Sequence, residues 1–472
     1  MAAQGEIGLF GLGPMGRNLA LNLADYGQRI YAFDSDPAVR AQDQPEKLSI
    51  TVCNSLVEVI DSLKPPMTLL LMVPAGKPVD QTLQALMPFL AENDVVVDCG
   101  NSHWRDTERR QASLRDRGVH WMGAGLSGGP EGARRGPAIM VGGPHNGWRR
   151  VGKTLEAIAA RAAGTPCCAW LGEGGAGHFV KTIHNGIEYA DMQLIAEVAT
   201  LMQRLLGLGV QASHEALEGW RGGPLKSYLL DIAAEVMGTI DPDTKRPLIQ
   251  VIVDRASEKG TGRWAAEAAL EMGAPAPTIS EAVAARAISA RRQQRATLAK
   301  SIAGPTNAAN VDRATWLPLL HDALFAGRLI TYAQGFAVLD AARKSQRWRM
   351  ELARVAELWR AGCIIRSSLL DDVAVIYDAL PDVENLLLAA DYREKLTPTL
   401  PALRGVVPMA TTQGLPVPAM ASSLAYLDGM RSARLSANVI EAMRDRFGGH
   451  GFGRLDKPGR STFPWPRGDE EL

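Results

Sequence analysis

Four side chains that can exchange protons or bind hydroxyl groups stand close together within the segment 177–197: Lys181, His184, Asn185 and Glu188. At about 100° per residue, these four fall within an arc of roughly 100° on one side of a helix. The opposite side is apolar and carries Val180, Ile183, Ile187 and Leu194. A base and an acid that line one buried cavity are the components of acid–base catalysis. The alternative is a solvated helix face, the usual setting of charges at this spacing, and the segment alone leaves both interpretations open.

The overall composition limits the classes of partner. The chain has 472 residues, which suggests about two to four domains. Hydrophobic residues make up 46% and charged residues 22%, as is typical of globular proteins. Lysine and arginine together number 51, equal to aspartate and glutamate. No overall positive field therefore attracts nucleic acid or an anionic membrane, so neither is expected as a partner, and any anion site must be local.

The cysteine pattern bears on the cellular compartment. The five cysteines are odd in number and lack C-x-x-C spacing, which argues against a disulfide scaffold and against a zinc module. A reducing compartment is therefore expected. The N-terminal residues enter a strand-and-turn pattern at once, and no segment approaches about 18 unbroken apolar residues. We expect a cytoplasmic protein.

A glycine-rich turn near the N-terminus indicates a dinucleotide site. Gly11, Gly13 and Gly16 form a G-x-G-x-x-G motif between a short apolar strand and an amphipathic helix. The first glycine permits the tight turn, the second lets backbone approach a pyrophosphate, and the third lets the helix pack on the strand. The helix N-terminus then faces the phosphates. The residues expected to bind the cofactor here are Gly11, Leu12, Gly13, Pro14, Met15 and Gly16.

An aspartate after the second predicted strand bears on the choice of cofactor. Asp34 follows Gly11 by 23 residues, close to the spacing expected for the acidic residue that binds the adenosine ribose. A carboxylate there accepts the 2′-hydroxyl and repels a 2′-phosphate, so NAD is favoured over NADP. Ser35 stands where NADP enzymes often place an arginine, and the nearest cation, Arg40, is expected in the next helix. The alternative is that Asp34 only starts a turn with Pro37.

Strand and helix signals alternate up to about Gly175, which predicts a largely parallel, doubly wound sheet of Rossmann-like type. Ligands bind at strand ends in such sheets, where Val73, Pro74, Ala75, Asn101 and Ser127 stand. The backbone N–H groups of Ser127, Gly128 and Gly129 are suited to holding a carboxylate, although such a stretch is more often a flexible loop. A serine nucleophile is not expected, because Ser127 lacks a G-x-S-x-G elbow.

From Gly177 onward, long segments with a period of 3.6 residues predict a mostly α-helical domain. One such segment, 281–303, is expected to be continuous helix. Lys259 and Thr261 stand in a glycine-flanked turn, and Arg286 lies in an apolar helix, so a phosphate would suit these groups. The alternative is that Arg286 pairs with a structural carboxylate.

The C-terminal tail begins as a helix, stops at Gly448 and Gly449, and is then too rich in glycine and proline to pack a core of its own. Four aromatic residues are expected to be exposed on it: Phe447, Phe452, Phe463 and Trp465. Docking onto a second subunit would explain them, with Arg444 and His450 delivered to the neighbour's site. We expect three parts: a Rossmann-like α/β dinucleotide-binding domain (1–176), an all-α substrate and dimerisation domain (177–434) and the tail (435–472).

Eight blocks of the chain resemble the 6-phosphogluconate dehydrogenase family in order and spacing: GLGPMG, DCGNS, SGGPEGARRGP, GHFVKTIHNGIEYADMQLI, EKGTGRW, ISEAVAAR, CIIRS and RDRFGGH. The resemblance runs from Ile7 to about Trp465. It implies oxidation of 6-phosphogluconate at C3, then decarboxylation to ribulose 5-phosphate, a reaction of the pentose phosphate pathway that reduces a nicotinamide cofactor. No metal is implied.

The resemblance also implies the catalytic roles. Lys181 would be the base that takes the 3-hydroxyl proton, and its ammonium would then polarise the 3-keto group. Glu188 would be the acid that protonates C1 of the enediol formed when CO2 leaves. Burial shifts the pKa of a lysine down and that of a glutamate up, as these roles require. His184 and Asn185 would orient the sugar hydroxyls and carbonyl.

Further residues match the family's substrate site. The family's carboxylate loop corresponds to Ser127, Gly128 and Gly129. Its phosphate site corresponds to Tyr189, Lys259, Thr261 and Arg286. Asn101 matches a residue near both nicotinamide and substrate. Arg444 and His450 match tail residues that the family supplies from the partner subunit, which implies a homodimer.

The departures from the family lie in the cofactor site. Many members have N-R-T after the second strand and a lysine in V-K-A-G, whereas this chain has Asp34, Ser35 and Asp36, and Pro74 in place of the lysine. Two partners for a 2′-phosphate are therefore missing, so NAD is expected, with NADP less favoured. Two alternatives stay open: a β-hydroxyacid dehydrogenase of the related superfamily that acts on a small unphosphorylated hydroxy acid, and a dinucleotide-binding regulator without turnover.

Overall fold

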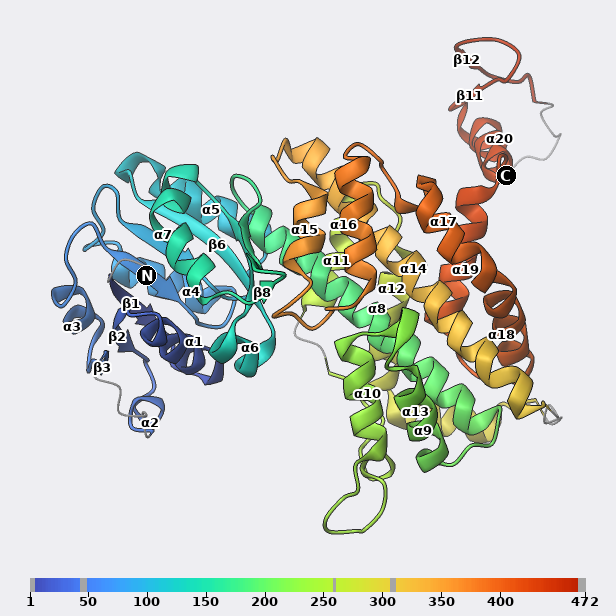
Figure 1. Cartoon of the computed structure of the whole chain (residues 1–472). Helices are drawn as coiled ribbons and strands as arrows, with labels where there is room; N and C mark the ends of the chain where they lie inside the picture. Colours follow the sequence, from blue (N-terminus) through green and yellow to red (C-terminus); the bar gives the residue numbers. More distant parts are fainter. Residues whose placement is uncertain (1–4, 43–48, 258–259, 306–310, 466–472) are drawn as a thin grey trace. The chain divides into compact units, whose positions relative to one another are not determined.

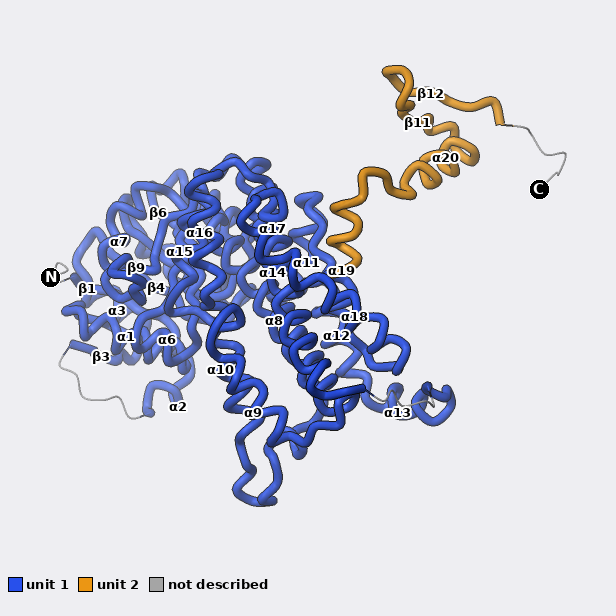
Figure 2. Tube along the Cα trace, turned by 45° about the vertical axis from the view of Figure 1, so that its right-hand side comes forward, with its two compact units in different colours: residues 1–423 blue, residues 424–472 orange. Residues whose placement is uncertain are grey.

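The computed structural model describes residues 5–42, 49–257, 260–305 and 311–465 (Figure 1). The chain forms two compact units, Met1–Ser423 and Leu424–Leu472 (Figure 2, blue and orange). The first unit contains an α/β part followed by a helical part, which confirms the predicted fold class. The domain boundaries at residues 176 and 434 stay predictions.

A mixed sheet forms the centre of the α/β part. Its strand order is β10-β7-β6-β5-β4-β1-β2-β3, and all neighbours pair in parallel except β6 and β7, which are antiparallel. The strands are β1 (Glu6–Phe10), β2 (Arg29–Phe33), β3 (Ile50–Val52), β4 (Thr68–Leu71), β5 (Val95–Asp98), β6 (His120–Ser127), β7 (Ala138–Gly142) and β10 (Cys168–Trp170). The sequence did not predict β3, which has three residues at the edge of the sheet.

The central strands are apolar because both faces of the sheet are buried. In β5, Val95 and Val97 belong to one hydrophobic core and Val96 belongs to the other. The helices of this part are α1 (Pro14–Asp25), α2 (Pro37–Arg40), α3 (Leu56–Asp61), α4 (Lys77–Leu86), α5 (Trp104–Leu114), α6 (Gly129–Arg135) and α7 (His145–Ile158). A short hairpin, β8 (Arg161–Ala162) and β9 (Thr165–Pro166), precedes β10.

Two long helices, α8 and α14, run through the helical part and pack against each other. The helices here are α8 (Ala176–Arg204), α9 (Val210–Trp220), α10 (Tyr228–Gly238), α11 (Thr261–Glu271), α12 (Pro277–Ser289), α13 (Arg292–Ser301), α14 (Arg313–Gln346), α15 (Leu352–Leu358), α16 (Leu369–Ala379), α17 (Ala390–Leu396), α18 (Leu400–Thr412) and α19 (Pro418–Arg431). The expectation of one continuous helix over 281–303 is wrong. The chain breaks between α12 and α13, where neither glycine nor proline signals it.

Helix α8 joins the sheet to the helical part (Figure 1). Its N-terminal half packs on β6 and β7, and its later turns pack on α11, α12 and α14. The approach to the sheet depends on Gly125 of β6, because a Cβ atom there would lie 2.3 Å from the Cβ of Lys181. The segment that carries the polar residues is therefore buried at the centre of its unit.

The second unit contains α20 (Ala437–Gly448) and a small hairpin of β11 (Phe452–Gly453) and β12 (Arg460–Ser461). The carboxylate of Asp445 organises it. Oδ1 accepts a hydrogen bond from Gly451 N (2.9 Å), and Oδ2 accepts from Phe463 N (3.0 Å) and Trp465 Nε1 (2.8 Å). The helix ends where predicted, with Gly449 in the left-handed region. Contrary to expectation, Phe452 and Trp465 are half-buried, whereas Phe447 and Phe463 are exposed.

All five cysteines are free and buried. None of the helices in the described part of the chain has the length and apolar character needed to span a bilayer.

Candidate active site

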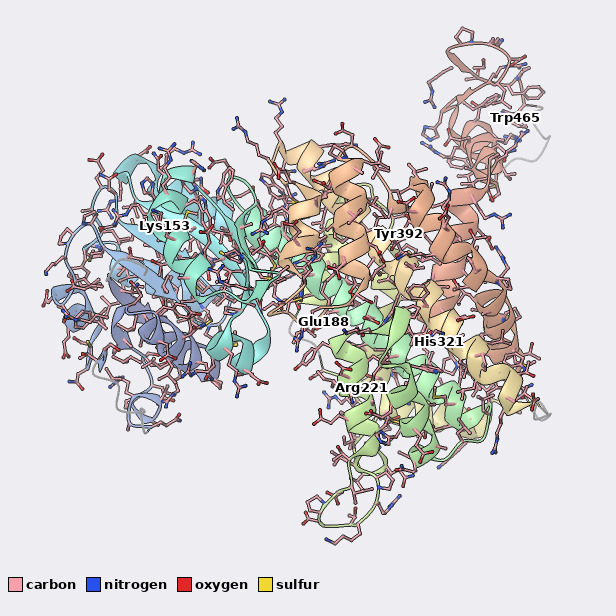
Figure 3. All side chains as sticks on the ribbon, in the orientation of Figure 1. Lys153, Glu188, Arg221, His321, Tyr392 and Trp465 are labelled. Carbon is pink, nitrogen blue, oxygen red and sulfur yellow. The ribbon has the colours of Figure 1, made fainter. Side chains whose placement is uncertain are left out.

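The polar stripe of α8 is buried. Lys181 is 6% exposed, His184 is fully buried and Asn185 is 7% exposed, whereas the side chain of Glu188 is 20% exposed. Figure 3 shows Glu188 in the middle of the first unit. A solvated helix face would leave these side chains in water. That interpretation of the stripe is therefore excluded.

His184 lies at the centre of the stripe. Its Nδ1 is 3.3 Å from Lys181 Nζ, 3.2 Å from Asn185 Oδ1 and 3.7 Å from Glu188 Oε2. Its Nε2 is 3.2 Å from Ser127 Oγ, at the end of β6. The structure thus brings together the stripe and the serine of the predicted carboxylate loop, which are far apart in sequence.

Burial shifts the pKa of all three ionisable groups in the stripe. It lowers the pKa of Lys181, against the opposing effect of the Glu188 charge. It raises the pKa of Glu188, against the effects of Lys181 and Arg286. Burial, reinforced by Lys181, also holds the pKa of His184 well below its usual value. These shifts run toward a neutral lysine, a protonated glutamate and a neutral histidine, which is the direction that a base and an acid in one cavity require.

The predicted carboxylate loop lies between β6 and α6 and begins with two glycines in the left-handed region. Gly128 and Gly129 both have positive φ, +102° and +64°, a region that glycine adopts readily. A Cβ at Gly128 would lie 2.6 Å from the carbonyl oxygen of Gly362, in the connection between α15 and α16. The same carbonyl accepts from Ala138 N at 2.9 Å. The backbone of Gly362 thus packs directly against Gly128 and bonds to the start of β7.

Sequence reasoning missed two residues of the helical part that support this site. One is Gly362, and the other is Trp359, whose ring packs edge-on against His184 with centroids 5.5 Å apart. Both stand just before the CIIRS block. The CIIRS block contributed to the family resemblance, but no role could be predicted for it. Its local sequence does not show that this segment packs against the sheet.

The residues predicted to bind phosphate gather around Tyr189. The guanidinium carbon of Arg286 lies 3.5 Å from the centre of the Tyr189 ring. A Cβ at Gly262 would lie 2.4 Å from the same ring, which places the start of α11, with Thr261, beside it. Lys259 lies outside the described residues. Arg286 is half-buried rather than buried, and its Nη1 donates to Ser257 O at 3.2 Å.

The alternative role of Arg286 was an ion pair with a structural carboxylate. Among the residues that the structure describes, no carboxylate lies within ion-pair distance of it. Its charge is instead felt by Glu188, whose pKa it lowers in part. Arg286 is thus a cation that an added anion could satisfy.

The three glycines of the N-terminal motif fit a dinucleotide. Gly11 has φ +100°, and a Cβ on Gly16 would lie 1.9 Å from Gly11 O, so the helix packs directly on the turn. Gly13 has open space above it and caps α1 without a side-chain hydrogen bond. The first turn of α1 therefore leaves N–H groups free for phosphate oxygens. Leu12 is buried, Met15 is half-buried and Pro14 is exposed at the rim.

Asp34 lies directly beside this turn. Its Oδ2 accepts from Leu12 N at 2.7 Å, and its Oδ1 accepts from Asp36 N at 2.9 Å. The second bond starts the turn before α2, and the first holds the carboxylate at the glycine turn. Its role toward the adenosine ribose stays a prediction. Ser35 beside it is exposed. Arg40 does lie in α2, but its Nη1 returns to donate to Asp34 O at 2.6 Å.

Val73, Pro74 and Ala75 follow β4, and Asn101 follows β5, so the four residues stand at the carboxyl ends of paired parallel strands. Pro74 and Asn101 are exposed and the other two are half-buried. This is the end of the sheet that carries the glycine loop and Asp34. One cofactor can therefore reach all of them.

Comparison with known proteins gives the family. The model of the NAD binding domain of 6-phosphogluconate dehydrogenase matches residues 6–172, and the model of the C-terminal domain of 6-phosphogluconate dehydrogenase matches residues 177–465. The chain belongs to the 6-phosphogluconate dehydrogenase family. The two matches together span the α/β part, the helical part and most of the tail.

Individual members of the 6-phosphogluconate dehydrogenase family are similar over nearly their whole length. Two decarboxylating enzymes of Bacillus subtilis, one NADP(+)-dependent and one NAD(+)-dependent, are each 40% identical over 463 residues, which is 98% of this chain and 99% of each relative. A solved structure of Plasmodium falciparum 6-phosphogluconate dehydrogenase is 34% identical, with a TM-score of 0.92 over 98% of this chain and 100% of that one. Overall identity thus does not distinguish between the two cofactors.

Arg444 and His450, the tail residues expected to reach a partner's site, lie in the second unit. Arg444 is exposed, and its Nη1 donates to Glu441 Oε1 at 2.6 Å. His450 is exposed, with its ring centre 6.0 Å from that of Phe447. Both flank the Asp445 network, which fixes the turn that carries them.

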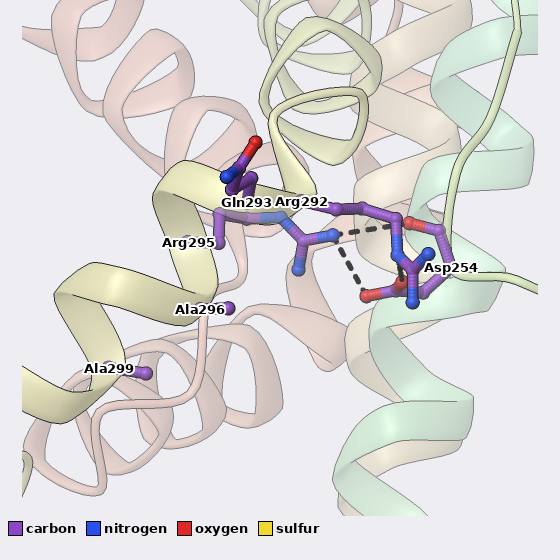
Figure 4. Close-up of a pocket in the computed structure, with 6 residues that line it drawn as sticks. All are labelled: Asp254, Arg292, Gln293, Arg295, Ala296 and Ala299. Carbon is purple, nitrogen blue, oxygen red and sulfur yellow. Dashed lines mark hydrogen bonds and ion pairs between the residues drawn. The ribbon is translucent and has the colours of Figure 1, made fainter.

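A separate cavity of about 600 Å³ lies at α13 (Figure 4). Its lining residues are Asp254, Arg292, Gln293, Arg295, Ala296 and Ala299. Asp254 pairs with Arg292 Nε and with Arg295 Nη2, each at 2.9 Å. None of the residues predicted for the active site lines this cavity, and its cations are already paired.

Proposed function

We propose that the chain oxidises 6-phosphogluconate at C3 and decarboxylates the product to ribulose 5-phosphate and CO2, with reduction of a nicotinamide cofactor. The observation that carries this proposal is the buried stripe of Lys181, His184 and Glu188, in which burial shifts the pKa of the base down and that of the acid up. The names of the relatives support the same reaction.

The residues of the chain divide the chemistry among them. A bound nicotinamide would accept the hydride from C3. Lys181, when neutral, removes the 3-hydroxyl proton, and its ammonium then withdraws electrons from the 3-keto oxygen as CO2 leaves. Glu188, when protonated, donates its proton to C1 of the resulting enediol. His184 and Asn185 hold hydroxyl and carbonyl oxygens in place.

The two charged ends of the substrate fix its direction. The N–H groups of Ser127, Gly128 and Gly129 bind the carboxylate, and Ser127 is held by His184. Tyr189, Thr261 and Arg286 bind the phosphate, together with Lys259. With its ends held, the substrate presents C3 to Lys181. After C1 has left as CO2, the neighbouring C2, which becomes C1 of the product, faces Glu188.

A coupled assay tests the reaction. Purified protein with 6-phosphogluconate and cofactor is expected to yield one CO2 for each nicotinamide reduced. A β-hydroxyacid dehydrogenase would oxidise only a small unphosphorylated hydroxy acid and release no CO2. A regulator would bind dinucleotide without substrate-dependent reduction, and either outcome would overturn the proposal.

We further propose that NAD is preferred over NADP. Asp34 uses two of its lone pairs on Leu12 N and Asp36 N and keeps acceptor capacity for ribose hydroxyls. A 2′-phosphate beside this carboxylate would be repelled. Arg40 donates to Asp34 O and places a cation next to the same loop. That cation offsets part of the repulsion, so a preference is expected rather than complete exclusion of NADP.

Comparing kcat/KM for the two cofactors tests this preference, and a higher value for NADP would contradict it. The double variant Asp34→Asn with Ser35→Arg should shift the ratio toward NADP. Asp36→Asn is the matched control, because this neighbouring carboxylate caps α2 through Ala38 N instead of facing the glycine loop. It should leave the ratio unchanged.

We also propose a homodimer in which Arg444 and His450 complete the neighbour's phosphate site. The support is the position of both residues on a separate compact unit and the exposed apolar side of α20, on which Val439, Ile440, Met443 and Phe447 are each more than half exposed. Exposed apolar faces of this extent mark interfaces.

A further inference from the structure

Arg110 of α5 is a buried cation that has no part in the acid–base chemistry. Its side chain is 1% exposed. Nε donates to Asp80 Oδ1 at 2.8 Å, and Nη2 donates to Gly76 O at 3.1 Å. Nη1 lies 3.5 Å from Asp98 Oδ2 and 3.4 Å from Ser102 Oγ. All three nitrogens of the guanidinium are therefore engaged.

Gly76 and Ser102 belong to two neighbouring loops at the carboxyl ends of β4 and β5, which pair in parallel. Asp98 is the last residue of β5, and Asp80 lies in the first turn of α4. Gly76 ends the loop that carries Val73, Pro74 and Ala75. The other loop surrounds Asn101, and Asp98 fixes its shape by accepting from Gly100 N at 3.1 Å and from Ser102 Oγ at 2.6 Å. One guanidinium thus sets the distance between the two loops.

The same helix is linked to the catalytic helix. Thr107 of α5 contacts His178 Nδ1 through its Oγ1 at 2.6 Å, and His178 stands one turn before Lys181 on α8. The imidazole fills the space above Gly123, where a Cβ would lie 2.7 Å from Nδ1. Two residues of α5, one turn apart, therefore connect these parts: Arg110 binds the two loops, and Thr107 contacts the helix that carries Lys181.

We propose that Arg110 is a positioning residue that sets the gap between the loops 73–76 and 99–102 and so places the nicotinamide ring relative to Lys181. The proposal rests on the proposed function, which requires a nicotinamide at these loops. The competing explanation is that Arg110 only stabilises the fold, as many buried ion pairs do. A positioning role predicts weaker binding of the nicotinamide half of the cofactor alone, whereas a role in stability predicts an equal effect on both halves.

Binding to the apoprotein separates them. Arg110→Lys keeps the charge but loses the planar fork that joins the loops. We expect NADH to bind roughly tenfold more weakly, whereas ADP-ribose, which lacks nicotinamide, should keep its affinity within about twofold. In turnover, KM for the cofactor should rise while KM for 6-phosphogluconate stays unchanged. Arg109→Met is the matched control, since Arg109 shares Asp80 at 2.9 Å but is 57% exposed and has no bond to either loop.

A second variant is needed because a change at Arg110 alone can destabilise the fold. It weakens the ion pair with Asp98 and leaves the Asp98 carboxylate as a buried charge. Arg110→Met with Asp98→Asn removes both charges and should show the same difference between NADH and ADP-ribose. Equal weakening of both ligands, or unchanged NADH binding in both variants, would overturn the positioning role. If the unaltered protein binds NADH but does not oxidise 6-phosphogluconate, the proposed function fails while the comparison of ligands still decides the role of Arg110.

Discussion

Lys181 and Glu188 are useful as base and acid only while each is in its less common protonation state. Burial is the first cause of both pKa shifts, and the two groups oppose each other's shift through their charges. Loss of one group therefore changes the other. This mutual dependence makes the pH profile a sharper probe than activity at a single pH.

Glu188→Gln should lower kcat roughly a hundredfold, within the range that general acid catalysis contributes. The profile of kcat against pH should also change shape. We expect the rate to fall at low pH because Lys181 becomes protonated, and to fall at high pH because Glu188 loses its proton. The variant should keep the first limb and lose the second, and a high-pH limb that persists would assign it to another group.

Lys181→Met should reduce kcat by about a thousandfold or more, because the proton acceptor at C3 is lost. NADH binding should be unchanged, since Lys181 is not among the residues assigned to the dinucleotide. Lys153→Met serves as control: Lys153 is exposed on α7 (Figure 3) and should keep full activity. An active Lys181→Met protein would refute the assignment of the base.

Spacing alone located the stripe of α8, because four polar residues on one side of an otherwise apolar helix are visible in the sequence. Arg40 and Gly362 could not be placed in this way. Arg40 reaches the backbone of Asp34 by folding back from α2, and Gly362 reaches the loop after β6 from the connection between α15 and α16. Such contacts depend on tertiary packing and leave no periodic signal.

At the scale of elements, the approach of α8 to β6 is set by a missing side chain. Gly125→Ala would put a methyl group 2.3 Å from the Cβ of Lys181, an atom that cannot turn away. The helix must shift, so we expect a loss of stability of about 1–3 kcal/mol and a clear fall in kcat/KM. Urea unfolding and kinetics measure both. Gly209→Ala, at a position with open space, should change neither strongly.

The other end of α8 carries a buried carboxylate whose titration should appear in stability. Glu197 Oε1 accepts from Ala419 N at 2.8 Å and Oε2 accepts from Met420 N at 3.0 Å, at the start of α19. Burial raises its pKa to about 7. The folded state therefore binds this proton more tightly than the unfolded state, and the free energy of unfolding should fall as pH rises from about 4.5 to about 7.

Glu197→Gln should remove this part of the pH dependence, a difference of up to about 3 kcal/mol across the interval. Urea unfolding of both proteins at several pH values measures it. Glu215→Gln is the matched control, because Glu215 accepts from Gln211 four residues earlier, as Glu197 does from Gln193, but is exposed. Equal slopes for Glu197→Gln and the unaltered protein would contradict the shift.

The elements themselves were largely predictable. Long apolar strands and strongly periodic helices were found because their patterns repeat over many residues. Two features were missed. Strand β3 has only three residues at a sheet edge, and the break between α12 and α13 contains neither glycine nor proline to signal it. There the choice of conformation is made by packing instead of by local preference.

At the scale of the whole molecule, the proposed exchange of tails can be tested by mixing two inactive chains. Lys181→Met and Arg444→Ala should each be inactive as homodimers. In a mixed dimer, the chain with an intact lysine receives an intact Arg444 from its partner. About a quarter of all sites should then be active after random reassociation, and no recovery would show that each tail serves its own site or none.

The residues proposed to select the cofactor and the residues proposed to move protons belong to different elements, the loop after β2 and the helix α8. We therefore expect that exchanges of two or three codons in that loop redirect the electrons from one dinucleotide pool of the cell to the other while the sugar chemistry is preserved.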